Sequence, residues 1–297
     1  MRTAGVFIIA VLLLQVANGQ EQSATQVNSV GTAFTTVSAT VPQGYSLDFS
    51  AAYPLYSGRS YPVFGHITAG VSSVLQVSYS NDEVVSNMIG VVRPLNSWGL
   101  KLQVLSKREE LPSVALWVRS ALGWQGDFLQ STDLWPKSPP TFEHLAGTQY
   151  EFTSTSAGVA LEPGISEALD VNVSLGLREL ESRNLWIFID PTPAGDNGYH
   201  AASGDRTLLL DGSANVVLHL LPRFAVIAEA TTLPYFDVNV PALKLEVKRG
   251  YAGAFGGRYT LPIPLSVDGY VRWQSTINGQ SNTQFRLGLS GQFSFVP

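Results

Sequence analysis

The stretch that most limits what this chain can fold into is its last one, residues 283–295. It reads T-Q-F-R-L-G-L-S-G-Q-F-S-F, so apolar residues such as Leu287 and Leu289 alternate with polar ones such as Arg286 and Ser290. Successive side chains on a β-strand point to opposite faces, so the pattern predicts a strand with one apolar and one polar face. Strands of about 9–11 residues with this alternation are typical of transmembrane β-barrels.

The same two-residue rhythm recurs along the chain, for example over residues 45–53, 98–104, 169–178 and 265–274. No helical period is sustained after the N-terminus. In lipid every backbone N–H and C=O must be paired within the protein, so an amphipathic sheet there has to close on itself. We therefore predict an all-β chain that forms a single closed antiparallel transmembrane β-barrel of about 12 strands, with 10 to 14 admissible.

Turn signals divide these strands. Short turns are predicted at Asn81-Asp82-Glu83 and at Pro94-Leu95-Asn96, and long irregular stretches at residues 123–147 and 191–205. Residues 243–261 keep one parity throughout and could form either one long strand or a hairpin. Tight, proline-bearing turns alternate roughly with longer polar ones, as expected for short periplasmic turns and longer external loops.

The N-terminus has the pattern of a secretory signal. Arg2 supplies a positive charge, residues 6–14 are almost all apolar, and Ala17-Asn18-Gly19 offers small residues for cleavage. The apolar run is shorter than the about 20 residues that a membrane-spanning helix needs. The predicted organisation is a signal peptide at 1–19, a flexible mature N-terminus at 20–31 and an outer-membrane β-barrel at 32–297.

Composition excludes several classes of function. Charged residues make up 14% of the chain, the net charge is -5, and there is no cysteine. A nucleic-acid partner would call for a basic patch, and thiol chemistry needs cysteine, so neither is expected. The histidines are scattered without ligand-like spacing, and no phosphate-binding glycine loop occurs. We expect no metal and no cofactor.

Charged residues gather on the polar face of the predicted strands. Turned outward at mid-bilayer, an Arg or Lys would cost about 2–4 kcal/mol, so these side chains are predicted to point into the lumen. There they could set the charge selectivity of a pore, or they could form a salt-bridged plug. The lumen-lining candidates are Asp48, Lys101, Arg119, Asp170, Arg178, Glu229, Arg258, Asp268, Arg272 and Arg286.

These features together resemble those of bacterial outer-membrane β-barrel proteins of the porin-like kind. The resemblance rests on the export signal, the repeated alternating strands, the Pro- and Gly-bearing turns and the phenylalanine-rich last strand. It implies the bacterial outer membrane as the location, with its lipid and the barrel-assembly machinery as partners. That machinery reads a terminal aromatic residue in this class, whereas here Val296 and Pro297 follow Phe295. Thr32-Ala33 with Pro42-Gln43-Gly44, and residues 67–70, look similar to segments of porin-like barrels, some of which are linked to exopolysaccharide export.

Several functions fit this pattern. The first is porin-like passage of small solutes across the outer membrane. The second is a non-transporting envelope barrel that supports surface structure or exopolysaccharide export. A barrel-embedded lipid hydrolase that uses His219, on the polar face, is a third, and a secreted soluble β-sandwich is a fourth. We expect that the protein is not an enzyme.

Overall fold

The computed structural model describes most of the chain, and the account below concerns only these residues: 39, 45–55, 64–86, 92–106, 111–132, 144–166, 168–190, 198–202, 204–239, 244–275 and 281–295. Within them every regular element is a β-strand. No helix in this part of the chain has the length and apolarity needed to cross a membrane. The predicted signal peptide (1–19) and flexible N-terminus (20–31) lie outside the described residues.

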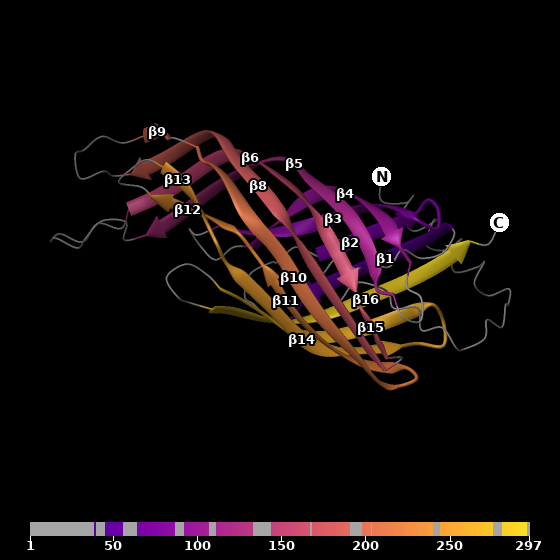
Figure 1. Cartoon of the computed structure of the whole chain (residues 1–297). Coiled ribbons are helices and arrows are strands. Elements are labelled where there is room, and N and C mark those ends of the chain that lie inside the picture. Colours follow the sequence, from indigo (N-terminus) through magenta and orange to yellow (C-terminus); the bar gives the residue numbers. More distant parts are fainter. Residues whose placement is uncertain are drawn as a thin grey trace.

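Twelve strands form a closed antiparallel barrel (Figure 1), which confirms the predicted fold class and strand number. The first strand pairs along its whole length with the last, from Tyr45 opposite Phe295 to Pro54 opposite Arg286, and pairing between the third and fourth strands completes the ring. The strands are β1 (Tyr45–Pro54), β2 (Phe64–Gly70), β3 (Leu75–Ser86), β4 (Val92–Leu105), β5 (Ser113–Thr132), β6 (His144–Glu162), β8 (Leu169–Asp190), β10 (Arg206–Leu221), β11 (Phe224–Thr232), β14 (Tyr251–Thr260), β15 (Leu265–Ser275) and β16 (Ser281–Phe295).

Four short strands extend this ring. β7 (Gly164–Ser166) and β9 (Gly198–Ala202) pair with β8, and β12 (Tyr235–Asn239) forms a hairpin with β13 (Lys244–Lys248). β12 also pairs with the end of β3 in parallel, which is the one parallel contact between described strands. β13 and β14 are separate strands that pair with β12 and with β11 and β15, respectively, so the described part of residues 243–261 forms neither one long strand nor a hairpin.

Several predicted boundaries are wrong. β3 and β4 pass through both predicted turns, with Asn81 opposite Asn96 and Glu83 opposite Pro94. The irregular stretches predicted at 123–147 and 191–205 contain the ends of β5 and β6 and all of β9. Where strands rise beyond the lipid both faces can meet water, so apolar and polar residues need not alternate and the sequence signal is lost.

The two ends of the barrel differ. Residues 71–74, 222–223 and 261–264 connect strands tightly at the end where β1 begins and β16 finishes, which we call the short-turn end. At the opposite, long-loop end, β5, β6 and β8 extend past the body of the barrel, as Figure 1 shows together with β9, β12 and β13. The predicted asymmetry between tight and long connections is therefore present in the structure.

Candidate functional site in the barrel lumen

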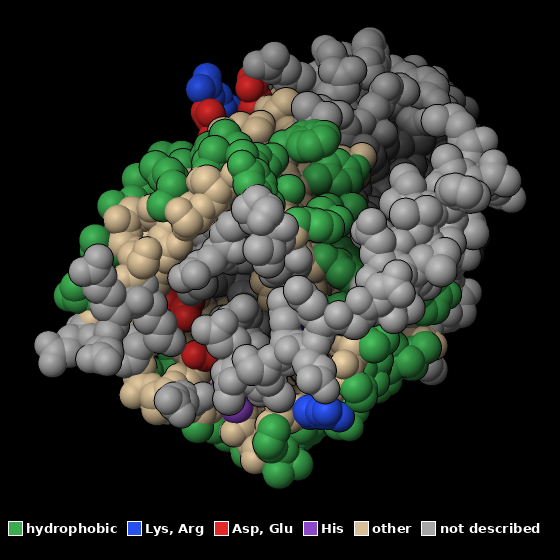
Figure 2. Space-filling model, turned by 90° about the vertical axis from the view of Figure 1, so that its right-hand side faces the viewer, with side chains coloured by type: hydrophobic (Ala, Val, Ile, Leu, Met, Phe, Trp, Pro, Cys, Tyr) green, Lys and Arg blue, Asp and Glu red, His purple; other side chains and the backbone are tan. Residues whose placement is uncertain are grey.

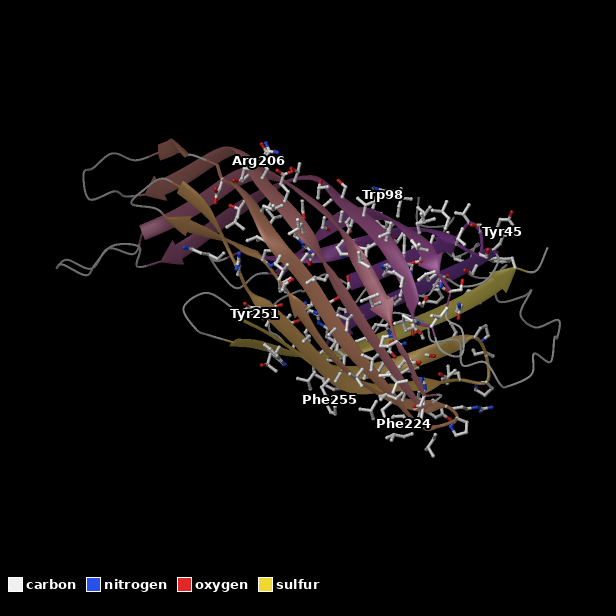
Figure 3. The ribbon with its side chains drawn as sticks, viewed as in Figure 1. Tyr45, Trp98, Arg206, Phe224, Tyr251 and Phe255 are labelled. Carbon is white, nitrogen blue, oxygen red and sulfur yellow. The ribbon has the colours of Figure 1, made fainter. Side chains whose placement is uncertain are left out.

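The outer wall of the barrel is an apolar belt. Side chains such as Trp98, Leu210 and Phe255 are 52%, 54% and 63% exposed. Figure 3 shows Tyr45, Trp98 and Phe255 pointing away from the barrel. On β10 every outward position from Leu208 to Leu220 is apolar or glycine. With about 3.3 Å per residue and a tilt of about 40°, this run is about 30 Å tall, which matches the hydrocarbon core of a bilayer.

Polar groups mark the edge of this belt that faces the long-loop end. Arg206 Nε lies 2.5 Å from Glu179 Oε1, and both side chains are on the outer face and exposed to solvent. Leu208 follows Arg206 on the same face. The belt therefore ends at the long-loop side where the first charged pair is found, as expected for a boundary between lipid and water.

The inner wall carries all ten candidate residues. Each has the parity of the buried side chains on its strand, and each is buried or half-buried. Glu162 and Asp211 share this face but were not in the predicted set, although Asp211 alternates with Leu210 and Gly212 in the expected way. Together, the charged residues that the structure describes on the inner face number six acids and six bases, so their charges balance.

Arg258 and Asp268 form a bidentate ion pair across neighbouring strands. They are directly opposite in the pairing of β14 with β15, with Nε–Oδ1 2.6 Å and Nη2–Oδ2 3.1 Å. Ser290 on β16 also donates to Asp268 Oδ2 at 3.4 Å. Both oxygens of this carboxylate are thus occupied, and a two-point Arg–carboxylate contact holds both side chains in one geometry.

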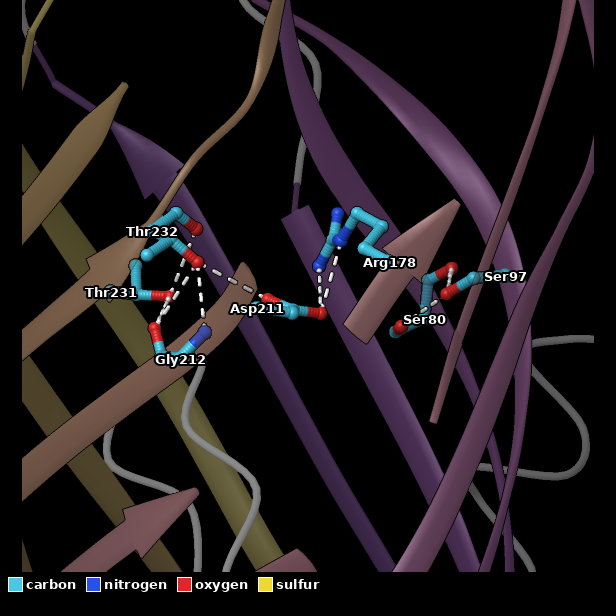
Figure 4. A network of polar contacts seen from close by, with 7 residues as sticks. All are labelled: Ser80, Ser97, Arg178, Asp211, Gly212, Thr231 and Thr232. Carbon is cyan, nitrogen blue, oxygen red and sulfur yellow. Dashed lines mark hydrogen bonds and ion pairs between the residues drawn. The ribbon is translucent and has the colours of Figure 1, made fainter. Parts of the chain in front are cut away.

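A second ion pair joins Arg178 of β8 to Asp211 of β10. Nε and Nη2 of Arg178 donate to Asp211 Oδ2 at 3.0 and 2.9 Å. The other oxygen of Asp211 accepts from Thr232 Oγ1 at 3.3 Å, and that hydroxyl oxygen accepts from the backbone N–H of Gly212 at 2.9 Å (Figure 4). The network links three consecutive barrel strands, β8, β10 and β11, on the inside of the wall.

His219 contacts Asp170 on the same side of the lumen, with Nε2 2.8 Å from Oδ2. This supplies two of the three groups that a serine hydrolase needs. Within the described residues no serine hydroxyl hydrogen-bonds to His219, and no group of three or more potential metal ligands occurs. The pair is best described as a lumen histidine held by a carboxylate.

Beside the pair of Arg178 and Asp211, the inner wall formed by β5, β6 and β8 contains glycines that lie against an aromatic ring. The indole of Trp117 lies over the backbone of Gly158 and Gly176, where an added Cβ would fall 2.7 and 2.9 Å from Trp117 Cζ2. Ala39, which precedes β1 in the chain, is fully buried in a cluster with Trp117 and two inward alanines. Its carbonyl accepts from Ser113 Oγ at 3.4 Å. A residue outside the barrel strands thus occupies space within the lumen near the short-turn end.

Charge is unevenly distributed along the barrel. Asp48 and Asp268 are the fourth residues of their strands from the short-turn end, and Asp170 is the second. Arg258 is the third residue from that end, but Arg178 and Arg286 are the tenth residues of their strands. Figure 2 looks into the short-turn mouth and shows acidic side chains inside the apolar rim. Along the lumen from this mouth, acidic side chains therefore come mainly first and basic side chains lie further in.

Comparison with solved structures agrees with this architecture. The translocator domain of the autotransporter NalP from Neisseria meningitidis is similar over 98% of this chain and 97% of its own, with a TM-score of 0.50 and 12% identity. A monoaromatic hydrocarbon channel, CymD, is 10% identical over 87% of this chain and 90% of its own (TM-score 0.46), and the porin NanC is 13% identical over 82% and 98% (TM-score 0.41).

No model of a known protein family matches the sequence, and no curated protein sequence matches it. The likeness to NalP concerns the fold. Together with the lipid-facing belt and the polar interior, that fold defines the class: the chain is a membrane-spanning β-barrel of the bacterial outer-membrane type.

Proposed function

We propose that this barrel is a narrow channel for small polar solutes, closed in the conformation described here by its own inner side chains. The observation that carries the proposal is the inner wall, where polar and charged side chains outnumber apolar ones such as Leu180 and Ile227 among the buried residues. Buried ion pairs can often be replaced by apolar residues of similar volume without loss of stability. If the lumen never admitted water, apolar side chains would therefore fill it at least as stably. The charged inner wall thus favours a lumen that water enters in an open state.

The closed state follows from burial. Arg286 and Arg272, which lie well inside the barrel, are 1% and 3% exposed. The pairs of Arg178 with Asp211 and of Arg258 with Asp268 also turn the charged groups toward each other instead of toward a continuous water column. Opening requires such contacts to separate, and water and solute then take their place.

The same burial favours one alternative, a non-transporting barrel that supports the envelope. In that case the ion pairs would fix the barrel's interior permanently. The two functions differ in one measurable property, which is whether the lumen ever conducts ions.

Single-channel recording of the purified full chain in planar bilayers separates the two. We expect discrete, low-conductance steps with long closed intervals. Asp211→Asn weakens a charge-assisted contact worth about 1.5–3 kcal/mol, so it should raise the ratio of open to closed time by about tenfold or more. Arg206→Gln, which removes a charge from the outer face, should leave the recordings unchanged. If neither the native chain nor Asp211→Asn gave current steps at any voltage, the channel proposal would be rejected and the envelope barrel would remain.

A further inference from the structure

Two neighbouring strands place an unusual cluster on the inner wall. Arg272 and Gln274 of β15 and Gln284 and Arg286 of β16 all point inward and are 3%, 2%, 4% and 1% exposed. Arg272 lies directly opposite Gln284 in the strand pairing, and Arg286 is its diagonal neighbour. Diagonal neighbours in a sheet are close enough for long side chains to meet. We refer to these four residues as the β15–β16 cluster.

The amide groups of this cluster have hydrogen atoms to donate. Arg286 donates through Nε and Nη2 to Gln284 Oε1, at 3.2 and 2.8 Å. A guanidinium group only donates, so the atom that faces it must be the amide oxygen, and this fixes the orientation of the Gln284 side chain. Gln284 Nε2, and both polar atoms of Gln274, have no hydrogen-bond partner among the described residues. Buried polar atoms in this state are uncommon and indicate a missing partner.

The surrounding wall has a small excess of positive charge. Asp268 engages Arg258 through both of its oxygens and accepts from Ser290 as well. Glu229 lies on the same row as Arg272, two strands away, and only the small side chain of Ala254 lies between them, so Glu229 can offset one of the neighbouring positive charges. On the inner faces of β11, β14, β15 and β16 the structure describes five charged side chains: Glu229, Arg258, Asp268, Arg272 and Arg286. They leave one base in excess.

From this geometry we infer that the β15–β16 cluster is a binding site for the oxyanion group of a small solute, a carboxylate or a phosphate. The guanidinium groups of Arg272 and Arg286 supply the charge and a planar set of donors that matches two oxygens of such a group. The amide hydrogens of Gln274 and Gln284 complete its hydrogen bonds. Arg272 is three residues from Ser275, the last residue of β15 at the long-loop end, so the solute would approach from that side.

The inference rests on the proposed function, since the oxyanion must reach the lumen. Binding can nevertheless be measured without conduction. A ligand that binds only the folded barrel raises its thermal midpoint, so the full chain in lipid vesicles can be unfolded in citrate, phosphate or chloride at equal ionic strength. We expect citrate, phosphate or both to raise the midpoint above that in chloride, and the responding anion identifies the type of oxyanion.

Two variants locate the effect. Arg272→Gln removes one charge, and Gln274→Leu replaces an amide by an apolar group of similar size. Each should weaken the apparent affinity for the oxyanion by about tenfold, the factor that corresponds to one charge-assisted hydrogen bond. Arg206→Gln should bind as the native chain does. Because Gln274→Leu removes no charge, we expect it to fold even if Arg272→Gln does not.

The two proposals fail separately. An equal midpoint in all three salts, or an oxyanion effect of the same size in Gln274→Leu as in the native chain, would overturn the binding site whatever the conductance. Oxyanion binding that depends on Gln274 in a barrel that never conducts would overturn the channel and support the site. Conducting barrels in which citrate and phosphate neither bind nor reduce the current would support the channel and remove the site.

Discussion

Replacing Val216 by arginine is expected to lower the free energy of unfolding by about 2–4 kcal/mol, the cost of placing a charge against the middle of the lipid core. Val216 is on the outer face of β10, between Val171 of β8 and Ala228 of β11 in the strand pairing. It lies well within the apolar run from Leu208 to Leu220. Equilibrium unfolding in urea of protein inserted into lipid vesicles, followed by tryptophan fluorescence, measures the change.

The matched control is Leu221→Arg on the same strand. Leu221 is the last residue of β10, at the short-turn end, and is exposed. An arginine there can reach the membrane surface, so the expected cost is only about 0–1 kcal/mol. If the two variants lost the same stability, or if Val216→Arg were neutral, the outer face of β10 would not be facing lipid.

The second large effect is expected at the ion pair of Arg258 and Asp268. Asp268→Leu leaves the guanidinium of Arg258, whose side chain is 12% exposed, without its carboxylate and should cost about 3–5 kcal/mol. The double change Arg258→Met with Asp268→Leu removes both charges and should fall near the stability of the native chain. The same unfolding measurement, applied to both single variants and the double variant, gives the coupling between the two residues.

The size of that loss also reports on water in the lumen. If Asp268→Leu cost less than about 1 kcal/mol, the Arg258 guanidinium would be solvated without its partner, as exposed ion pairs are. Such a result would contradict the closed interior and would indicate a lumen filled with water at this level even at rest.

The sequence predicts the membrane-spanning part of this fold well because lipid enforces a simple rule. On β16, every inward and outward position between Gln284 and Leu289 is correctly assigned by alternation alone. β2 (Phe64–Gly70) was not predicted, since it is short and its outward residues include a glycine and an alanine. The strand extensions beyond the lipid were also missed, because both of their faces can be polar.

The candidate site could be predicted only in part. Alternation assigns Arg272 and Arg286 to the inner face, but it gives no register between strands. The contact of Arg286 with Gln284 lies within one strand and could have been found from their spacing of two residues. The pairing of Arg178 with Asp211 joins residues far apart in the chain and depends on how β8 and β10 align. Ala39 gives no sequence signal for its place in the lumen.

The central claim is that one face of each strand meets lipid and the other meets the lumen, and β16 tests it most directly. The chain has no cysteine, so a single cysteine can carry a nitroxide label at Leu287, Leu289, Ser290 or Gln292. In lipid vesicles, collisions with dissolved oxygen should be frequent at Leu287 and Leu289 and rare at Ser290 and Gln292, since oxygen concentrates in the hydrocarbon core. A profile along β16 without this two-residue alternation would contradict a barrel with its apolar face in the membrane.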